Sequence, residues 1–381
     1  MGIDLFERID ELEKEYIDFW IDVCKIESPT EYKEGVDRVG RYFIEQATKR
    51  GWKIEIQNQP ESGDCICITM NPESKEQPII FSGHMDTVHP IGLFGKEVVV
   101  VDEEKIYGPG VGDCKGGIVA SFYAMAGLED CGFKFRPVKL LLQSDEENSS
   151  RSSNKSTIKY MCEKSEGCIA FLNVESATRG KATIARKGIC KYEFEVIGRA
   201  AHGSRCYDGA SAVCEAAYKI IELEKLKDIN GITCNCGIIH GGTAENTVPD
   251  KCIFTADIRF RDRQQKEIAE HIVQEVAEKS FVEGTSCKVV LKSLRPAMEQ
   301  TEENMSLLKK INQIYADVGM TLLEPRHDTG GADSAYITEC GLPCLDGFGV
   351  ISGRIHSKEE YAYLDSLKEA AKKLAVVGYY I

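Results

Sequence analysis

The sequence predicts an α/β protein into which a second, smaller α+β domain is inserted. Its 381 residues are long for a single hydrophobic core, so two domains are the natural expectation. Strand and helix signals alternate up to about residue 182, which is typical of a mixed or parallel sheet flanked by helices. Between residues 187 and 295 the order becomes β-α-β-β-α-β, which is the ferredoxin-like pattern. Because candidate site residues lie on both sides of this segment, we expect residues 1–186 and 296–381 to form one domain and 187–295 to be inserted into it.

The first domain begins with a predicted amphipathic helix over residues 4–27. Apolar residues recur there at helical spacing: Leu5, Ile9, Leu12 and Tyr16. The helix should end before Ser28-Pro29-Thr30, because proline disfavours helical backbone in the residue before it. Short apolar runs over 79–83, 138–143 and 169–174 predict buried strands, and a glycine-rich turn at 108–117 opens a predicted helix that continues to Leu128.

The inserted segment alternates strands and helices in a different rhythm. Strands are predicted for 191–198, 232–239, 252–260 and 287–294, and helices for 210–226 and 264–281. We find no internal repeat and no low-complexity stretch in the chain.

His84 and Asp86 follow the first of the buried runs and are separated by one residue, so both can turn toward one site. Neutral histidine is a good metal ligand, and a nearby carboxylate can accept its other ring N–H. More groups of this kind come after the other runs and turns: Asp113, Glu146, Glu147, Glu175 and His356. Sites in open α/β sheets form at the carboxyl ends of strands, so these groups can converge. Two histidines and three carboxylates suffice for two adjacent zinc-like ions if one carboxylate bridges them, which leaves one glutamate as a base.

Each motif also has an ordinary interpretation when taken alone. A histidine after a strand is commonly just hydrogen-bonded, and Asp145-Glu146-Glu147 could be a solvated charge run. The glycine-rich turn could suggest phosphate binding, but it lacks the Gly-Lys-Ser/Thr ending of a P-loop. The occurrence of all the motifs together and in order favours the metal site.

In these motifs the chain resembles the zinc-dependent exopeptidases and deacylases that include glutamate carboxypeptidase, acetylornithine deacetylase and succinyl-diaminopimelate desuccinylase, with glutamate carboxypeptidase as the nearest match. The resemblance runs nearly end to end, and it implies a dimetal exopeptidase catalytic domain with an inserted lid or dimerisation domain. It implies that His84 and Glu175 hold one metal and that Glu147 and His356 hold the other, with Asp113 bridging the two. Glu146 would be the general base and Asp86 would orient His84. The stretch Gly330-Gly331-Ala332-Asp333 resembles a loop that lines the substrate pocket in that family.

The inserted segment contains four further polar residues: His202, Asn246, Arg259 and Arg295. Singly, they suit a loop histidine, a turn asparagine and arginines in surface ion pairs. The resemblance implies that His202 and Asn246 hold the substrate carbonyl oxygen and that the arginines bind a substrate carboxylate, which the planar guanidinium suits. It also implies a homodimer, because the matching histidine often comes from the partner subunit. The proline usual after this histidine is absent from 204–207, which leaves the shape of this loop open.

Composition restricts the partners and the compartment. A net charge of −14 argues against nucleic acid, and no apolar run is long enough to span a membrane. The first six residues carry neither a secretory signal nor a myristoylation motif, so we expect neither. The 16 cysteines contain no Cys-x-x-Cys pair and many lie in apolar runs, which indicates free thiols in a reducing cytoplasm.

The sequence therefore predicts a metal-dependent hydrolase that cleaves a peptide or amide bond adjacent to a free carboxylate. By the resemblance, Glu at position 175 favours a carboxypeptidase or deacylase over an aminopeptidase. The expected substrate is a small peptide, and the expected metal is zinc, with cobalt and manganese as alternatives. Two other functions stay open: an N-acyl amino acid deacylase, and a catalytically inactive binding protein.

Overall fold

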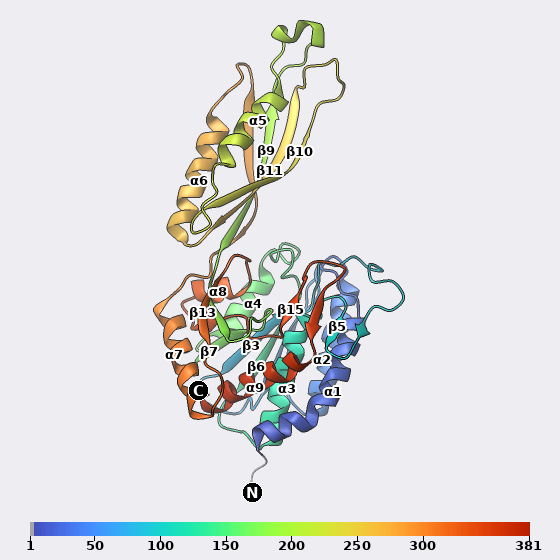
Figure 1. Ribbon diagram of the computed structural model, residues 1–381, viewed down its shortest axis with the longest axis vertical. Helices are drawn as coiled ribbons and strands as arrows, with labels where there is room; N and C mark the ends of the chain where they lie inside the picture. Colours follow the sequence, from blue (N-terminus) through green and yellow to red (C-terminus); the bar gives the residue numbers. More distant parts are fainter. Residues whose placement is uncertain (1–3) are drawn as a thin grey trace. The chain divides into compact units, whose positions relative to one another are not determined.

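The chain divides into two compact units (Figure 1). The computed structural model describes residues 4–381. Residues 1–3 lie outside the described residues, and they are part of the N-terminal segment in which we expect no secretory signal and no myristoylation motif. Unit 1 contains the chain up to Ile184 together with Gln300–His327 and Ala332–Ile381, and unit 2 contains Ala185–Glu299 and Asp328–Gly331. The predicted fold class, an α/β domain carrying an inserted ferredoxin-like domain, is confirmed.

Unit 1 is built on a six-stranded mixed sheet in the order β1-β2-β6-β3-β7-β14. Its strands are β1 (Lys53–Gln57), β2 (Cys65–Met70), β3 (Ile79–His84), β6 (Val138–Gln143), β7 (Ala170–Asn173) and β14 (Cys344–Leu345). The four strands from β6 to β14 run parallel, whereas β2 is antiparallel to both β1 and β6. Strands β3 and β7 are fully buried, as continuous apolar runs in a parallel sheet require.

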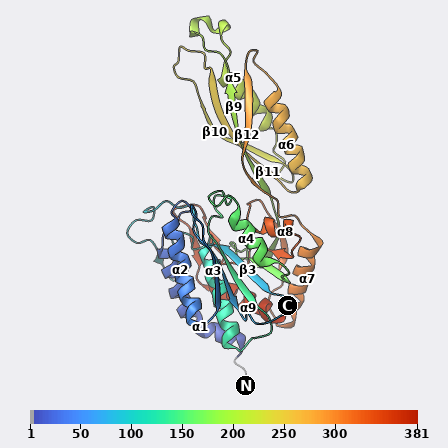
Figure 2. The ribbon, with the colours of Figure 1, turned by 180° about the vertical axis from the view of Figure 1, so that it is seen from behind.

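Helices cover both faces of this sheet. They are α1 (Leu5–Lys25), α2 (Lys33–Lys49), α3 (Lys115–Asp130), α4 (Ser156–Ser165), α7 (Glu302–Asp317), α8 (Ser334–Glu339) and α9 (Asp365–Tyr380). Successive residues of β3 face opposite sides, so Gly83 lies against Ile118 of α3 while Ser82 contacts Met161 of α4. Figure 1 looks onto the α3 and α9 side of unit 1 and Figure 2 onto the α4 side. None of the helices in the described residues is long and apolar enough to cross a membrane.

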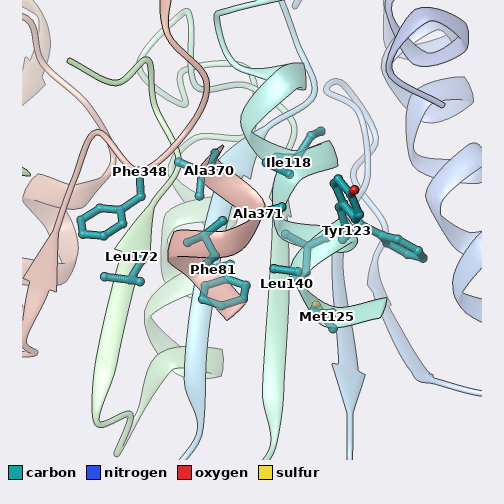
Figure 3. Packing of buried hydrophobic residues seen from close by; sticks show 14 of the residues in the cluster. Phe81, Ile118, Tyr123, Met125, Leu140, Leu172, Phe348, Ala370 and Ala371 are labelled. Carbon is teal, nitrogen blue, oxygen red and sulfur yellow. The ribbon is translucent and has the colours of Figure 1, made fainter. Parts of the chain in front are cut away.

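The core of unit 1 lies between the sheet and the pair α3 and α9 (Figure 3). Phe81 on β3 pairs in register with Leu140 on β6 and with Leu172 on β7, which places the three side chains in one row on the same face. Helix α3 is buried over most of its length and supplies Ile118 and Tyr123 to this core. The strands that carry the candidate site are therefore fixed by packing.

Two small sheets complete unit 1. One contains β15 (Ser352–Gly353), β16 (Tyr361–Tyr363), β5 (Lys105–Tyr107) and β4 (Val100–Val101), in that order. The other pairs β8 (Lys181–Arg186) with β13 (Glu324–Asp328), and the last residues of both strands already belong to unit 2. The sheet with β15 brings the loop of His356 beside the glycine-rich turn that follows β5.

Unit 2 has the predicted element order, with each boundary within a few residues of its expected place. Its elements are β9 (Gly188–Ile197), the 3-10 helix η1 (Gly203–Asp208), α5 (Ala212–Leu223), β10 (Thr233–Gly241), β11 (Lys251–Phe260), α6 (Arg263–Glu278) and β12 (Ser286–Arg295). The antiparallel strand order β10-β11-β9-β12 is that of a ferredoxin-like sheet. Alternate residues of β9, such as Tyr192 and Phe194, pack in one core with α5 and α6, which leaves the opposite face of the sheet without helices of this unit.

Candidate metal centre

His84 is the last residue of β3, and its imidazole is only 1% exposed. Its Nδ1 lies 2.9 Å from the backbone carbonyl of Asp86. Because a carbonyl can only accept, Nδ1 carries the proton and, in the neutral ring, Nε2 presents a lone pair. That Nε2 atom faces Asp113 Oδ1 at 3.2 Å and Glu175 Oε1 at 3.6 Å. The lone pair of Nε2 and the two carboxylate oxygens are all acceptors and repel one another, so a proton or a cation must lie among them.

The second oxygen of Asp113 faces a different histidine. Asp113 Oδ2 lies 3.1 Å from Nε2 of His356, and the same Nε2 lies 3.3 Å from Glu147 Oε2. The carboxylate of Asp113 therefore stands between two imidazoles that are far apart in the sequence. His356 differs from the other residues of the set because it follows the two-residue strand β15 and not a strand of the central sheet, and its side chain is 53% exposed.

Glu146, Glu147 and Glu175 follow the carboxyl ends of β6 and β7, as predicted. The carboxylate of Asp86 accepts the backbone N–H of Glu146 at 3.2 Å and that of Glu147 at 3.1 Å. The hydroxyl of Thr30 donates to the same carboxylate at 2.7 Å. Asp86 thus contacts His84 at 3.3 Å, as expected, and also fixes the loop that carries both glutamates.

Close approach of α3 to β7 requires glycine at the start of the helix. A Cβ atom at Gly117 would lie 1.9 Å from the carbonyl oxygen of Val174, the residue before Glu175. Any other side chain would push the two elements apart. The glycine-rich motif therefore brings Asp113 and Glu175 close together.

The close packing of acids and imidazoles shifts their pKa values. The hydrogen bonds of His356 with Asp113 and Glu147 raise its pKa to about 10. Burial, together with the charge of Asp113, raises the pKa of Glu147 to about 7 and that of Glu175 well above its usual value. Burial opposes charge on Asp113, but the two histidines hold its pKa far below the usual range. The acids outnumber the bases, so the site as a whole attracts positive charge.

The spacing of these donor atoms fits metal coordination. At a zinc–ligand distance of about 2.0 Å, two ligands of a tetrahedral ion lie about 3.3 Å apart. The four histidine–carboxylate distances, 3.2 and 3.6 Å around His84 and 3.1 and 3.3 Å around His356, are close to this value. Nitrogen and carboxylate oxygen are also the donors that zinc, cobalt and manganese accept.

Glu146 and Asp333 lie with His84 and Glu175 around a packing gap that is too small for a water molecule. Asp333 belongs to the Gly-Gly-x-Asp stretch, which resembles a loop that lines the substrate pocket in the family. Both carboxylates are buried, with Glu146 6% and Asp333 4% exposed.

Three residues near the centre were not identified from the sequence. Cys114 lies within reach of His84 and Glu175, but its thiol donates to the carbonyl of Val174 at 3.4 Å, and burial raises its pKa, which disfavours the thiolate that metals bind. His89 and Glu360 contact the loops of the candidate ligands. The sequence offered one signal for these two residues, namely their closeness to candidate ligands: His89 lies five residues after His84, and Glu360 lies four residues after His356.

In unit 2, His202 and Asn246 lie on adjacent loops. The backbone N–H of Gly203 donates to the carbonyl of Asn246 at 2.6 Å, and His202 forms a β-bridge with Thr247. The side chains of His202 and Asn246 are both exposed. After His202 the chain forms η1, and the His202 ring accepts the N–H of Ser204 at 3.3 Å. This is the conformation of the loop that lacks the usual proline.

Arg259 and Arg295 lie at the other end of the same sheet. Both pair in register with Ile189, so they flank it on the face away from α5 and α6. Arg259 also donates to the carbonyl of Thr329 at 3.0 Å. From Ile189 to Ile197 is eight residues of strand, or about 26 Å at about 3.3 Å each. Figure 1 shows η1 at the end of unit 2 opposite the start of β9. The structure therefore does not bring His202 and the arginines of one chain together.

A mixed α/β sheet with a histidine and several carboxylates at its carboxyl edge, and a second histidine on an adjoining loop, is typical of a metallohydrolase. Residues 80–377 match the model of peptidase family M20/M25/M40, and the chain belongs to this family. It is a metal-dependent hydrolase of peptide or amide bonds. All predicted ligand positions and Glu146 are present, whereas an inactive binding protein would be expected to have lost some of them.

Relatives agree with this assignment, and solved structures agree with the fold. The chain is 25% identical over 351 residues to carboxypeptidase G2 of Pseudomonas sp. (strain RS-16), covering 91% of this chain and 84% of that protein. It is 26% identical to the acetylornithine deacetylase of Myxococcus xanthus, covering 83% of each. Its fold is similar to the aminopeptidase PepT from Bacillus cereus, with a TM-score of 0.78 at 18% identity over 96% of this chain and 97% of that one. An M20 family metallo-carboxypeptidase from Sulfolobus solfataricus gives a TM-score of 0.74 at 17% identity, over 95% and 98% of the two chains.

Proposed function

We propose that the chain is a carboxypeptidase-like enzyme with two divalent ions, of which zinc is the expected metal. His84 and Glu175 would hold one ion, His356 and Glu147 the other, and Asp113 would bridge them. The observation that carries this proposal is that the two oxygens of Asp113 face different imidazoles, at 3.2 and 3.1 Å. When bound, two such ions polarise a substrate carbonyl group and lower the pKa of a water molecule between them.

Glu146 is the proposed general base. It would accept the proton of the attacking water and pass it to the leaving nitrogen. Its position supports this role, because Glu146 is buried beside His84 and Glu175 and its backbone N–H is fixed by Asp86. Asp86 thus positions the base and the neighbouring ligand Glu147 at the same time.

The proposed substrate carries a free carboxylate beside the scissile amide. Arg259 and Arg295 flank Ile189 in one row of the sheet, which suits two guanidinium groups that bind one carboxylate. The likeness to a carboxypeptidase supports a peptide substrate, and the likeness to acetylornithine deacetylase supports an N-acyl amino acid as the second candidate.

We propose further that residues 187–295 act as a lid and dimerisation domain, and that His202 and Asn246 serve the site of a partner subunit in a homodimer. The separation of about 26 Å along β9 prevents these two residues from joining the arginines of their own chain around one small substrate. The edge strand β10 is exposed and carries the apolar residues Ile238 and Ile239, which an adjoining subunit would cover. In the site of the partner subunit, the imidazole of His202 would stabilise the developing oxyanion.

A reducing cytoplasm is the proposed compartment. All 16 cysteines are free thiols, and those closest to another cysteine, Cys162 with Cys340 and Cys234 with Cys236, have their sulfurs 3.4 and 4.0 Å apart. This pattern suits a protein kept in a reducing environment.

Replacement of Glu146 by alanine tests the proposed chemistry. Metal-loaded parent and Glu146→Ala proteins should be assayed against a panel of dipeptides and N-acyl amino acids with zinc, cobalt or manganese. Because the proposed base is not a ligand, the variant should keep both ions and lose roughly 10²–10⁴-fold in kcat. Metal content unchanged with activity within a fewfold of the parent would refute the role of Glu146.

Subunit mixing tests the proposed dimer. Glu146→Ala and His202→Ala proteins should each be nearly inactive, but after subunit exchange about one quarter of all sites would contain neither lesion if His202 acts across the interface. Activity should therefore reappear on mixing. Mixing Glu146→Ala with Glu146→Gln is the matched control and should restore nothing. No recovery in the first mixture, despite proven exchange, would refute the shared site.

A further inference from the structure

The exposed half of the centre needs support that its own residues do not supply. His356 is 53% exposed, and its backbone has a φ of 62°, in the left-handed region that non-glycine residues adopt with strain. Neither burial nor a regular element therefore fixes its position. Neighbouring groups must hold this loop in place if its imidazole is to bind an ion.

Glu360 is the first of these groups. Its side chain is fully buried and lies four residues after His356. One carboxylate oxygen accepts the backbone N–H groups of Gly112 at 2.9 Å and Asp113 at 3.1 Å, and the other accepts that of Gly110 at 3.3 Å. Such a buried carboxylate is tolerated only when it is hydrogen-bonded. These contacts join the loop of His356 to the loop of the proposed bridging ligand and occupy the oxygens that a metal would otherwise use.

His89 is the second group, and it comes from the segment that follows His84. It is 4% exposed, and its Nε2 lies 3.2 Å from the carbonyl of Ser357 and 3.4 Å from Glu360 Oε2. Since the carbonyl can only accept, Nε2 carries the proton and donates toward both oxygens. Phe94 packs edge-on against the ring, with the centroids 5.1 Å apart. His89 thus connects the loop after β3 with the residue next to His356.

We propose that His89 and Glu360 form a positioning pair that locks the loops of His84, Asp113 and His356 together and thereby sets the affinity of the exposed half for its ion. The inference rests on the proposed two-metal function. Partners in the surroundings of metal ligands commonly change metal affinity by about 10–100-fold when they are removed. Neither residue is proposed to touch the ion or the substrate.

Metal titration of the metal-free protein tests the pair. His89→Leu removes the donor, whereas His89→Gln is the matched control because its amide can place an N–H near the position of Nε2. Glu360→Gln is an independent variant that puts an amide group among three backbone N–H donors. The measurements are the affinities of the two binding steps for zinc, the absorption spectrum of the cobalt-loaded protein, and the Tm of the metal-free protein.

We expect His89→Leu and Glu360→Gln to weaken one binding step by roughly 10–100-fold and to leave the other within about threefold. The cobalt spectrum of the weakened step should change, the loss of affinity should stay confined to that step even where the Tm of the metal-free protein falls, and His89→Gln should recover most of the affinity. The double variant His89→Leu/Glu360→Gln should lose no more than the worse single variant, because the two residues act as a unit.

Three results would overturn the pair: unchanged affinities in both variants, equal losses in His89→Leu and His89→Gln, or losses in both binding steps that merely follow a lowered Tm. A parent protein that binds fewer than two ions would instead refute the proposed two-metal function. The two failures are therefore distinguishable in one titration.

Discussion

The two histidines of the centre are held in opposite ways. His84 ends a buried strand of the central sheet, is 1% exposed and has its tautomer set by the carbonyl of Asp86. His356 lies on a loop after a two-residue strand and is 53% exposed. The sheet thus builds one half of the centre, and contacts between loops hold the other. We therefore expect changes to His84 to affect both metal and stability, and changes to His356 to affect mainly metal.

The largest expected difference is between His84→Ala and His356→Ala. Both should lower metal content. In the metal-free protein, His84→Ala should also cost about 3–5 kcal/mol, because it leaves buried carboxylates without their partner. His356→Ala should cost less, since its imidazole is 53% exposed and water can take its place beside Asp113 and Glu147.

Metal analysis and urea unfolding of the chelator-treated proteins measure both effects. Two tightly bound ions in either variant would remove that histidine from the ligand set. Equal losses of stability would contradict the division into a buried and an exposed half.

The proposed carboxylate site shows a similar contrast, because Arg295 is buried and Arg259 is half-buried. Replacing either arginine with alanine should lower kcat/KM for carboxylate-bearing substrates by roughly 1.5–3 kcal/mol, the scale of a hydrogen bond to a charged group. We expect the larger loss for Arg295, where solvent screens the interaction less.

Amidation of the substrate carboxylate completes the thermodynamic cycle. It should cost the parent a similar amount and each arginine variant much less, because coupling identifies the partner. Additive losses for both arginines would show that neither binds the carboxylate.

The smallest expected effect is a pH dependence that metal removes. Burial raises the pKa of Glu147 to about 7, so the folded protein holds a proton there that the unfolded chain releases near pH 4.3. The stabilising contribution is therefore complete below about pH 4.3 and is lost as the pH rises through about 7. For His356, whose pKa is raised to about 10, the contribution persists below about pH 6.5 and is lost only through about pH 10.

Metal ions replace these protons. The difference in Tm between metal-loaded and metal-free protein should therefore widen from about pH 5 to about pH 8, the range over which Glu147 loses its proton in the metal-free protein. Thermal unfolding across this range measures the gap, and Glu147→Gln should flatten the fall in the metal-free protein. A gap that stays constant with pH would show that the carboxylates of the centre do not take up protons on folding.

Much of the fold follows from local patterns. The continuous apolar runs of β3, β6 and β7 are strands, and the β-α-β-β-α-β order of 187–295 gives the four-stranded sheet of unit 2. These elements could be predicted because their hydrophobic periodicity and turn residues are encoded over short stretches of chain. The candidate ligands could be identified because polar groups that follow such runs meet at one edge of the sheet.

The sequence by itself determined the α/β class and the insertion, and it indicated the candidate residues of the metal centre. Only the tertiary structure decided how those residues are held. Asp86 fixes the loop of Glu146 and Glu147, His89 and Glu360 join loops distant in the chain, and His202 lies beyond the end of β9 opposite to that of the arginines. The physical reason is that periodicity and spacing act over a few residues, whereas these contacts join atoms brought together only when the sheet and its loops have packed. Hydrogen bonds between such distant segments leave no pattern in a single sequence.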